Sequence, residues 1–130
     1  MEEKTIHTPG ECKKHIVRVE TALAVLNGKW KLPIILSLQF GNKRFSQIAK
    51  EIPNITDKML SKELRDLECH ELVERKVYDS RPVVIEYRLT EYGSTLKPVI
   101  EMLRNWGATH EARMRSKEKE MQHTAADGLL

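Results

Sequence analysis

Apolar residues recur along the first half of the chain with a helical period. Val19, Leu23 and Leu26 share one helical stripe within residues 16–26. Residues 30–38 are apolar on nearly every side, which predicts a largely buried helix with Pro33 in its first turn. A short helix is expected over residues 45–51. Thr56 is a candidate N-cap for a further helix that ends near residues 69–71 and turns Leu60, Leu64 and Leu67 inward.

The period then changes from helix to strand. Residues 72–78 and 84–90 are rich in Val, Ile, Tyr and Leu, and a polar tip at 79–82 joins them into a β-hairpin. Thr90 is expected to cap a last helix from residue 91 to about 114, kinked at Pro98. Residues 1–15, with Pro9-Gly10 as a breaker, are predicted to form a flexible arm, and residues 116–130 a disordered tail. One domain over residues 16–115 remains.

The order of these elements is that of a winged helix-turn-helix. A short helix, a turn and a second helix form the helix-turn-helix, and the hairpin that follows is the wing. The fold class is therefore α+β and mainly helical. The second helix is polar and cationic on its outer face, as a helix in the major groove of DNA requires. The candidate DNA-contacting residues are Lys43, Arg44, Thr56, Lys58, Ser61, Lys62, Arg65 and Arg81.

Charge supports this interpretation only through its distribution. The net charge of the 130 residues is +3, but residues 21–60 contain six basic and two acidic side chains. Such an excess favours a polyanionic partner. The longest apolar run, residues 32–36, is too short to span a membrane, so no membrane partner is expected. The two cysteines cannot form a disulfide scaffold and suit the cytoplasm.

Enzyme chemistry finds little support in the residues. No nucleophile has a paired base, and no cofactor is expected. His7, Cys12 and His15 lack a second ligand pair, so no metal site is predicted. Cys12 is a candidate redox sensor, because the adjacent Lys13, Lys14 and His15 would favour its reactive thiolate.

Six short motifs in series resemble the HxlR-type regulators, a branch of the winged helix-turn-helix transcription factors related to the MarR group. They are LNGKWK (26–31), GNKRF (41–45), ITDKML (55–60), LRDLE (64–68), LVER (72–75) and EYRLTEYG (86–93). The resemblance implies a homodimeric regulator that represses or activates transcription at a double-stranded DNA operator. Several members of the family sense oxidants or electrophiles through a cysteine.

The chain departs from the family pattern at two positions. The family's sensing cysteine lies eleven residues before the Gly of Gly-Lys-Trp, where this chain has Val17, and Cys12 lies five residues further upstream. Glu71 stands where many members have Gly, at the end of the second helix of the helix-turn-helix. A Glu there must avoid the left-handed conformation or destabilise the fold by about 1 kcal/mol.

The resemblance also implies that the first and last helices form the dimer interface. The apolar stripe of the last helix runs further than a winged helix of 90 residues needs, which agrees with this. The predicted interface residues are Val19, Leu23, Leu96, Ile100, Leu103 and Trp106. The effector is unknown, and a small-molecule pocket near the dimer helices is possible. A protein-interaction module on a winged-helix scaffold is the alternative function.

Overall fold

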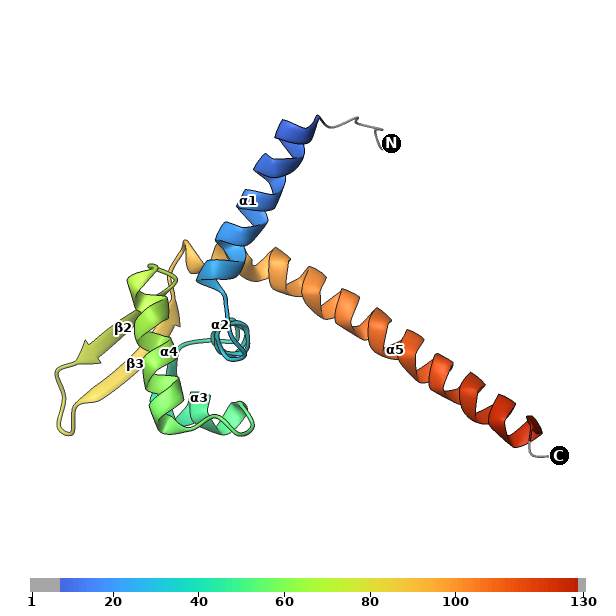
Figure 1. Ribbon diagram of the computed structural model, residues 1–130. Helices are drawn as coiled ribbons and strands as arrows, with labels where there is room; N and C mark the ends of the chain where they lie inside the picture. The colour runs from blue at the N-terminus through green and yellow to red at the C-terminus, as the bar shows by residue number, and fades with distance from the viewer. Residues whose placement is uncertain (1–7, 129–130) are drawn as a thin grey trace. The chain divides into compact units, whose positions relative to one another are not determined.

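Residues 8–128 are described by a computed structural model, shown in Figure 1. In chain order the elements are α1 (Pro9–Val25), α2 (Lys31–Leu38), β1 (Lys43–Arg44), α3 (Phe45–Glu51), α4 (Asp57–Cys69), β2 (Val73–Tyr78), β3 (Val84–Leu89), the 3-10 helix η1 (Gly93–Leu96) and α5 (Lys97–Gly128). The chain divides into two units at the boundary between Gly93 and Ser94.

The core of the first unit is formed where α2, α3 and α4 pack together with the start of β2. The residues that are fully buried share an aliphatic character, so the core is held by apolar contact. They are Ile34, Ile35, Ile48, Leu60, Leu64 and Leu67. The inward residues of α4 follow the predicted helical stripe. Thr56 caps α4 as expected, since its side chain accepts a hydrogen bond from the backbone N–H of Met59 at 3.1 Å.

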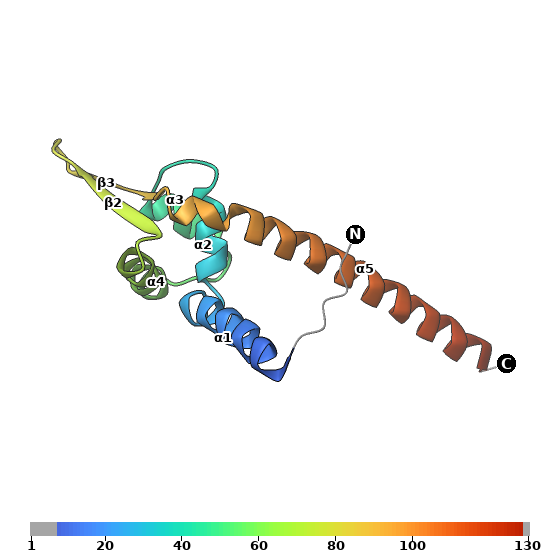
Figure 2. The same ribbon diagram turned by 90° about the horizontal axis from the view of Figure 1, so that it is seen from above.

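The sheet has three antiparallel strands in the order β1-β3-β2. The hairpin of β2 and β3 pairs Val73 with Leu89 and Tyr78 with Val84, within one residue of the predicted ends. Figures 1 and 2 show this hairpin extending away from the helices of its unit, as a wing does. Strand β1 is an addition that the sequence did not predict, because two residues are too short for an alternating pattern.

Glu71, at the end of α4, adopts the left-handed conformation, which is the strained one of the two alternatives that the sequence analysis gave. Its φ is +62°, in the left-handed region. The backbone N–H of Leu72 donates to Leu67 O at 3.0 Å, and that of Glu71 to Glu68 O at 2.9 Å. This pair of bonds is the Schellman motif, in which Gly usually occupies the left-handed position. Leu67 and Leu72 are both buried, as the motif's apolar partners commonly are.

Helix α1 begins earlier than the sequence predicted. It starts at Pro9 rather than residue 16, so the predicted arm is wrong over residues 9–15, while residues 1–7 lie outside the described part. Thr8 caps the helix: its hydroxyl accepts from Glu11 N at 3.2 Å, and Glu11 Oε1 accepts from Thr8 N at 3.1 Å. Pro9-Gly10 therefore begins a helix, because Pro is well suited to the first helical position.

The second unit is mostly one helix, α5. It begins at Lys97 after η1, so Pro98 lies in its first turn. Pro is tolerated there without bending the helix, and the reason for the predicted kink at Pro98 is therefore removed. The helix continues to Gly128, which makes the predicted disordered tail wrong over residues 116–128, while 129 and 130 lie outside the described part. Within residues 8–128, none of the helices has the length and apolar character that a membrane crossing requires.

Candidate nucleic-acid interface

Helix α4 presents three exposed cations on the face opposite its buried stripe. Lys58, Lys62 and Arg65 are exposed, and Ser61 between them is half-buried. Arg65 Nη1 donates to Ser61 Oγ at 3.5 Å, one turn back along the helix. The candidate residues of α4 thus lie together at helical spacing and are accessible to a polyanion. The acidic side chains of the helix behave as expected where they pair with neighbours, as Glu63 and Asp66 do.

The adjacent candidates Lys43 and Arg44, just before α3, differ in exposure and in their partners. Arg44 is exposed at the N-cap, where Gln47 Oε1 accepts from its backbone N–H at 2.8 Å. The Lys43 side chain is only 13% exposed, and its Nζ lies 2.6 Å from Glu51 Oε1 and 3.2 Å from Ser37 Oγ. The hydrogen bond from Lys43 to Glu51, a second from Ser37 at 2.6 Å and the charge of Lys43 lower the pKa of Glu51 below its usual range. The positive charge of Lys43 is therefore neutralised within the unit.

The wing places Arg81 in its tip, between β2 and β3. Arg81 is exposed, and the adjacent Ser80 hydroxyl donates to Pro82 O at 2.8 Å. Below the tip, the hydroxyl of Tyr78 donates to Glu86 Oε1 at 3.0 Å, which raises the pKa of Tyr78. These contacts order the hairpin around its exposed cation.

A buried ion pair beneath α4 is a feature that the sequence analysis missed. Lys31 is 5% exposed, and its Nζ lies 2.5 Å from Glu63 Oε1 and 3.4 Å from Asp66 Oδ2. Burial by itself lowers the pKa of Lys31, but the hydrogen bonds and charges of Glu63 and Asp66 outweigh it and raise the pKa. Two features of the sequence could have indicated this pair. Lys31 stands in an otherwise apolar helix, and Glu63 lies beside the apolar stripe of α4.

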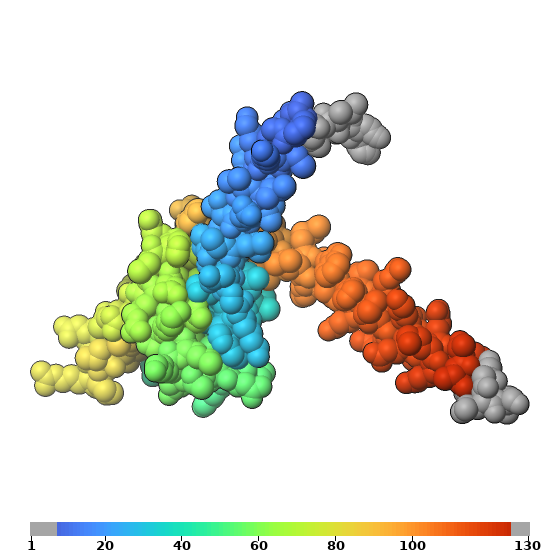
Figure 3. Space-filling model, in the orientation of Figure 1, coloured from blue at the N-terminus to red at the C-terminus, as the bar shows by residue number. Residues whose placement is uncertain are grey.

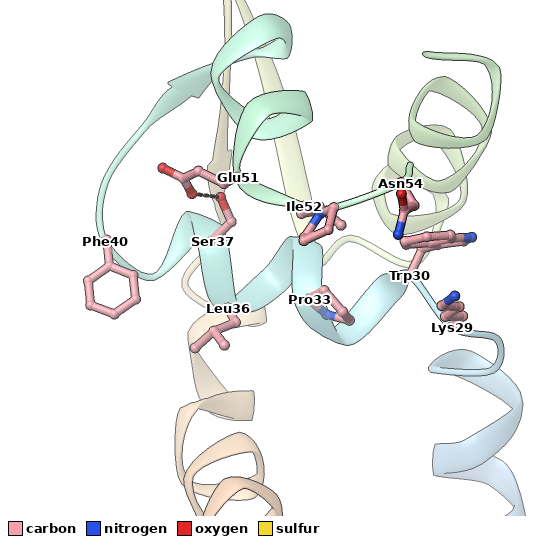
Figure 4. A pocket seen from close by; sticks show the side chains of 10 residues that line it. Lys29, Trp30, Pro33, Leu36, Ser37, Phe40, Glu51, Ile52 and Asn54 are labelled. Carbon is pink, nitrogen blue, oxygen red and sulfur yellow. Dashed lines mark hydrogen bonds between the residues drawn. The ribbon is translucent and has the colours of Figure 1, made fainter. Parts of the chain in front are cut away.

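A groove lies between α2 and the turn from α3 into α4 (Figure 4). Its volume is about 520 Å³, within the range of small-molecule sites. Figure 4 shows Trp30 and Asn54 at one end, and Ser37 with its bonded Glu51 towards the other. Trp30 is half-buried and forms a wall of this groove.

The predicted dimer residues differ in their exposure. Val19 and Leu23 are 58% and 61% exposed on α1, a helix without a buried residue whose open surface is seen in Figure 3. Leu103 and Trp106 are also exposed on α5, and the Trp106 ring stacks on His110 at 5.1 Å between centroids. Leu96 is half-buried. Ile100 is only 7% exposed.

Both cysteines carry free, exposed thiols. Cys12 lies in the first half of α1 and Cys69 is the last residue of α4. Lys13, Lys14, Val17 and Arg18, which follow Cys12 in the sequence, line a shallow depression on α1. Over residues 8–128 no three His, Cys, Asp or Glu side chains are grouped so as to hold a metal ion.

The helix-turn-helix of α3 and α4, followed by the β2–β3 hairpin, defines a winged helix-turn-helix protein. Residues 25–115 match the HxlR-like helix-turn-helix family, and the chain belongs to this family.

Three known proteins show how close the likeness is. The HTH-type transcriptional regulator YtcD of Bacillus subtilis is 44% identical over 104 residues, covering 80% of this chain and 82% of YtcD. The solved structure of the redox regulator HypR in its reduced form matches with a TM-score of 0.72 at 38% identity, over 76% of this chain and 98% of HypR. A MarR-family transcriptional regulator from Enterococcus faecalis V583 matches with a TM-score of 0.69 at 30% identity, over 85% of this chain and 96% of that structure. This chain is a transcriptional regulator of the same fold.

Proposed function

We propose that the protein is a homodimeric, sequence-specific regulator that binds a double-stranded DNA operator and catalyses no reaction. The observation that carries the proposal is the exposed cationic face of α4, formed by Lys58, Lys62 and Arg65 opposite a buried aliphatic stripe. A recognition helix needs this division, because donors must reach phosphates and base edges while the other face holds the helix to its domain. Such a regulator acts on the chromosome and so in the cytoplasm.

Four of the exposed candidates can be assigned a role in DNA binding. Arg65 and Lys62 face base edges or the adjacent phosphates, with Ser61 held beside Arg65. Arg44 and the N-terminus of α3 approach a phosphate, and Arg81 reaches the backbone or minor groove from the wing. Lys43 supports the start of α3 through Glu51, so we assign it a structural role instead of a phosphate contact.

The test is operator binding by the Arg65→Ala variant, with the operator first identified by selection from a random duplex pool. Loss of a base contact should weaken operator binding by about 1–3 kcal/mol and relax the sequence preference. Arg115→Ala, which removes an exposed Arg from α5, is the matched control and should bind as the wild type does. Unchanged operator binding by Arg65→Ala and by Lys62→Ala would rule out α4 as the recognition helix.

The proposed dimer is supported by apolar residues exposed on α1 of the first unit and on α5 of the second. Ile16, Val19 and Leu23 on α1 are more than half exposed, and Leu103 and Trp106 on α5 are at least half exposed. Apolar side chains at this density on a helix mark an interface. Leu23→Glu and Leu103→Glu should each yield monomers in sedimentation at micromolar concentration. A wild-type monomer under the same conditions contradicts the dimer.

A response to oxidants or electrophiles is a second part of the proposal. It rests on the exposed Cys12, on the cationic residues that follow it in α1, and on the likeness to the redox regulator HypR. Wild type and Cys12→Ser should be compared for operator binding with and without a quinone, with Cys69→Ser as the matched variant. Loss of the quinone effect only in Cys12→Ser supports the sensor, and equal binding in every condition contradicts it.

The protein-interaction alternative differs from DNA binding in its response to salt. Phosphate neutralisation makes DNA affinity fall steeply as salt rises. Wild-type protein that shows no salt-dependent binding to any duplex would favour the interaction module.

A further inference from the structure

The carboxylate of Asp66 lies between a buried and an exposed lysine. Its Oδ2 is 3.4 Å from Lys31 Nζ and 3.5 Å from Lys62 Nζ. The Lys31 side chain is 6% exposed, that of Asp66 41% and that of Lys62 66%. One acidic oxygen thus connects the interior of the first unit with the cationic face of α4.

The position of Asp66 is fixed from the inside. Lys31 Nζ is itself held by Glu63 Oε1 at 2.5 Å and by Asn27 Oδ1 at 3.4 Å. These bonds do not depend on Lys62, whose exposed side chain can move away while the carboxylate stays. Partial burial raises the pKa of Asp66, but the hydrogen bond from Lys31 and the charge of Lys62 outweigh it and lower the pKa. Asp66 therefore remains ionised at neutral pH.

A fixed carboxylate at this place opposes phosphate binding in two ways. It competes with DNA for the ammonium of Lys62, and it carries the same sign of charge as the phosphates. Exposed pairs at i and i+4 are weak, so the competition lowers the affinity without preventing binding.

We propose that Asp66 is a positioning residue that restrains Lys62 and lowers the sequence-independent part of the affinity for DNA. This inference rests on the proposed DNA-binding function. It goes beyond that function because it assigns a task to an acidic side chain on the DNA-facing helix.

The experiment compares wild type with Asp66→Asn on a random-sequence duplex, by fluorescence anisotropy from about 50 to 200 mM salt. Asn keeps the size of the side chain and an oxygen for Lys31, and a thermal unfolding curve checks the fold. The variant should bind about threefold more tightly at low salt, because Lys62 is released to a phosphate. The slope of log affinity against log salt should steepen by up to about 0.9, the value for one complete further phosphate contact. A purely structural role for Asp66 would not steepen this slope.

Two controls distinguish the restraint on Lys62 from a change of net charge. Glu68→Gln removes the same charge from the same helix and should leave the slope unchanged. In a Lys62→Gln background, the Asp66→Asn change should no longer steepen the slope. An unaltered slope for Asp66→Asn, or the same steepening without Lys62, overturns the inference. Absence of salt-dependent binding by the wild type instead contradicts the proposed function itself.

Discussion

Lys31 and Glu63 are 32 positions apart in the chain, and their Nζ and Oε1 atoms meet at 2.5 Å in the interior. The pair joins the first residue of α2 to the inner face of α4, beside the aliphatic core. A buried pair of charges is a weak source of net stability but strongly penalises the loss of one partner. The setting of α4 on its domain therefore depends on this contact.

Removal of the Lys31 charge should destabilise the fold. Lys31→Met leaves Glu63 buried without its cation, which should lower the free energy of unfolding by about 3 kcal/mol in urea denaturation. Glu63→Met in the same background should restore much of the loss, since neither charge then remains unpaired. Lys50→Met, at an exposed position of α3, is the control and should change stability by less than about 0.5 kcal/mol.

The same pair predicts a loss of stability at alkaline pH. The pKa of Lys31 is raised in the fold above the ordinary 10.5, so its contribution is complete below that value and disappears as the pH rises through the raised pKa. The difference in unfolding free energy between wild type and Lys31→Met should be constant near neutral pH and shrink above about pH 10.5. A difference that grows with alkaline pH contradicts the assignment.

Glu71 predicts a stabilising substitution at the end of α4. Its φ of +62° is unfavourable for a residue with a Cβ atom and costless for glycine. Glu71→Gly should raise the free energy of unfolding by about 0.5–1 kcal/mol in urea denaturation. Glu71→Ala keeps the Cβ atom and should show no such gain. Equal gains in both variants would assign the effect to the Glu side chain instead of the backbone.

The two glycines Gly93 and Gly107 should respond oppositely to a methyl group. A Cβ at Gly93 would lie 2.0 Å from the backbone oxygen of Leu72, so Gly93→Ala should destabilise the protein by about 2 kcal/mol or more. A Cβ at Gly107 meets nothing within 4 Å, and Gly107→Ala should stabilise α5 by up to about 1 kcal/mol. Thermal unfolding of both variants distinguishes the two sites, and similar melting temperatures would contradict this contrast.

Local signals predicted the helix-turn-helix well. The range of α3 and the cap at Thr56 agree with the sequence prediction, because short-range spacing and capping chemistry decide both. The sequence prediction made α1 too short because Pro9 was interpreted as a helix breaker, whereas Pro is also common at the first position of a helix. The capping contacts between Thr8 and Glu11 show that Pro9 begins the helix. The polar end of α5 has no apolar period to predict a helix beyond residue 114.

The sequence predicted the element on which each cationic side chain lies more readily than whether that side chain is exposed or bound in an ion pair. Lys43 and Arg44 are adjacent in the sequence and equal in formal charge, yet one is bonded to Glu51 and the other is exposed. Lys31 was counted with the positive stretch and is buried in an ion pair with Glu63. These partners lie between 8 and 32 positions away, so they depend on the packed fold and not on local pattern.

Thr90 links the recognition helix and the wing at their common base. Its hydroxyl donates to Glu71 O at 2.6 Å and accepts from Gly93 N at 2.8 Å, while its backbone N–H donates to Leu72 O at 3.1 Å. These bonds hold the end of α4 and the base of the β2–β3 hairpin together. In the proposed dimer, any change in the distance between the two DNA-binding units would therefore move each α4 together with its own hairpin.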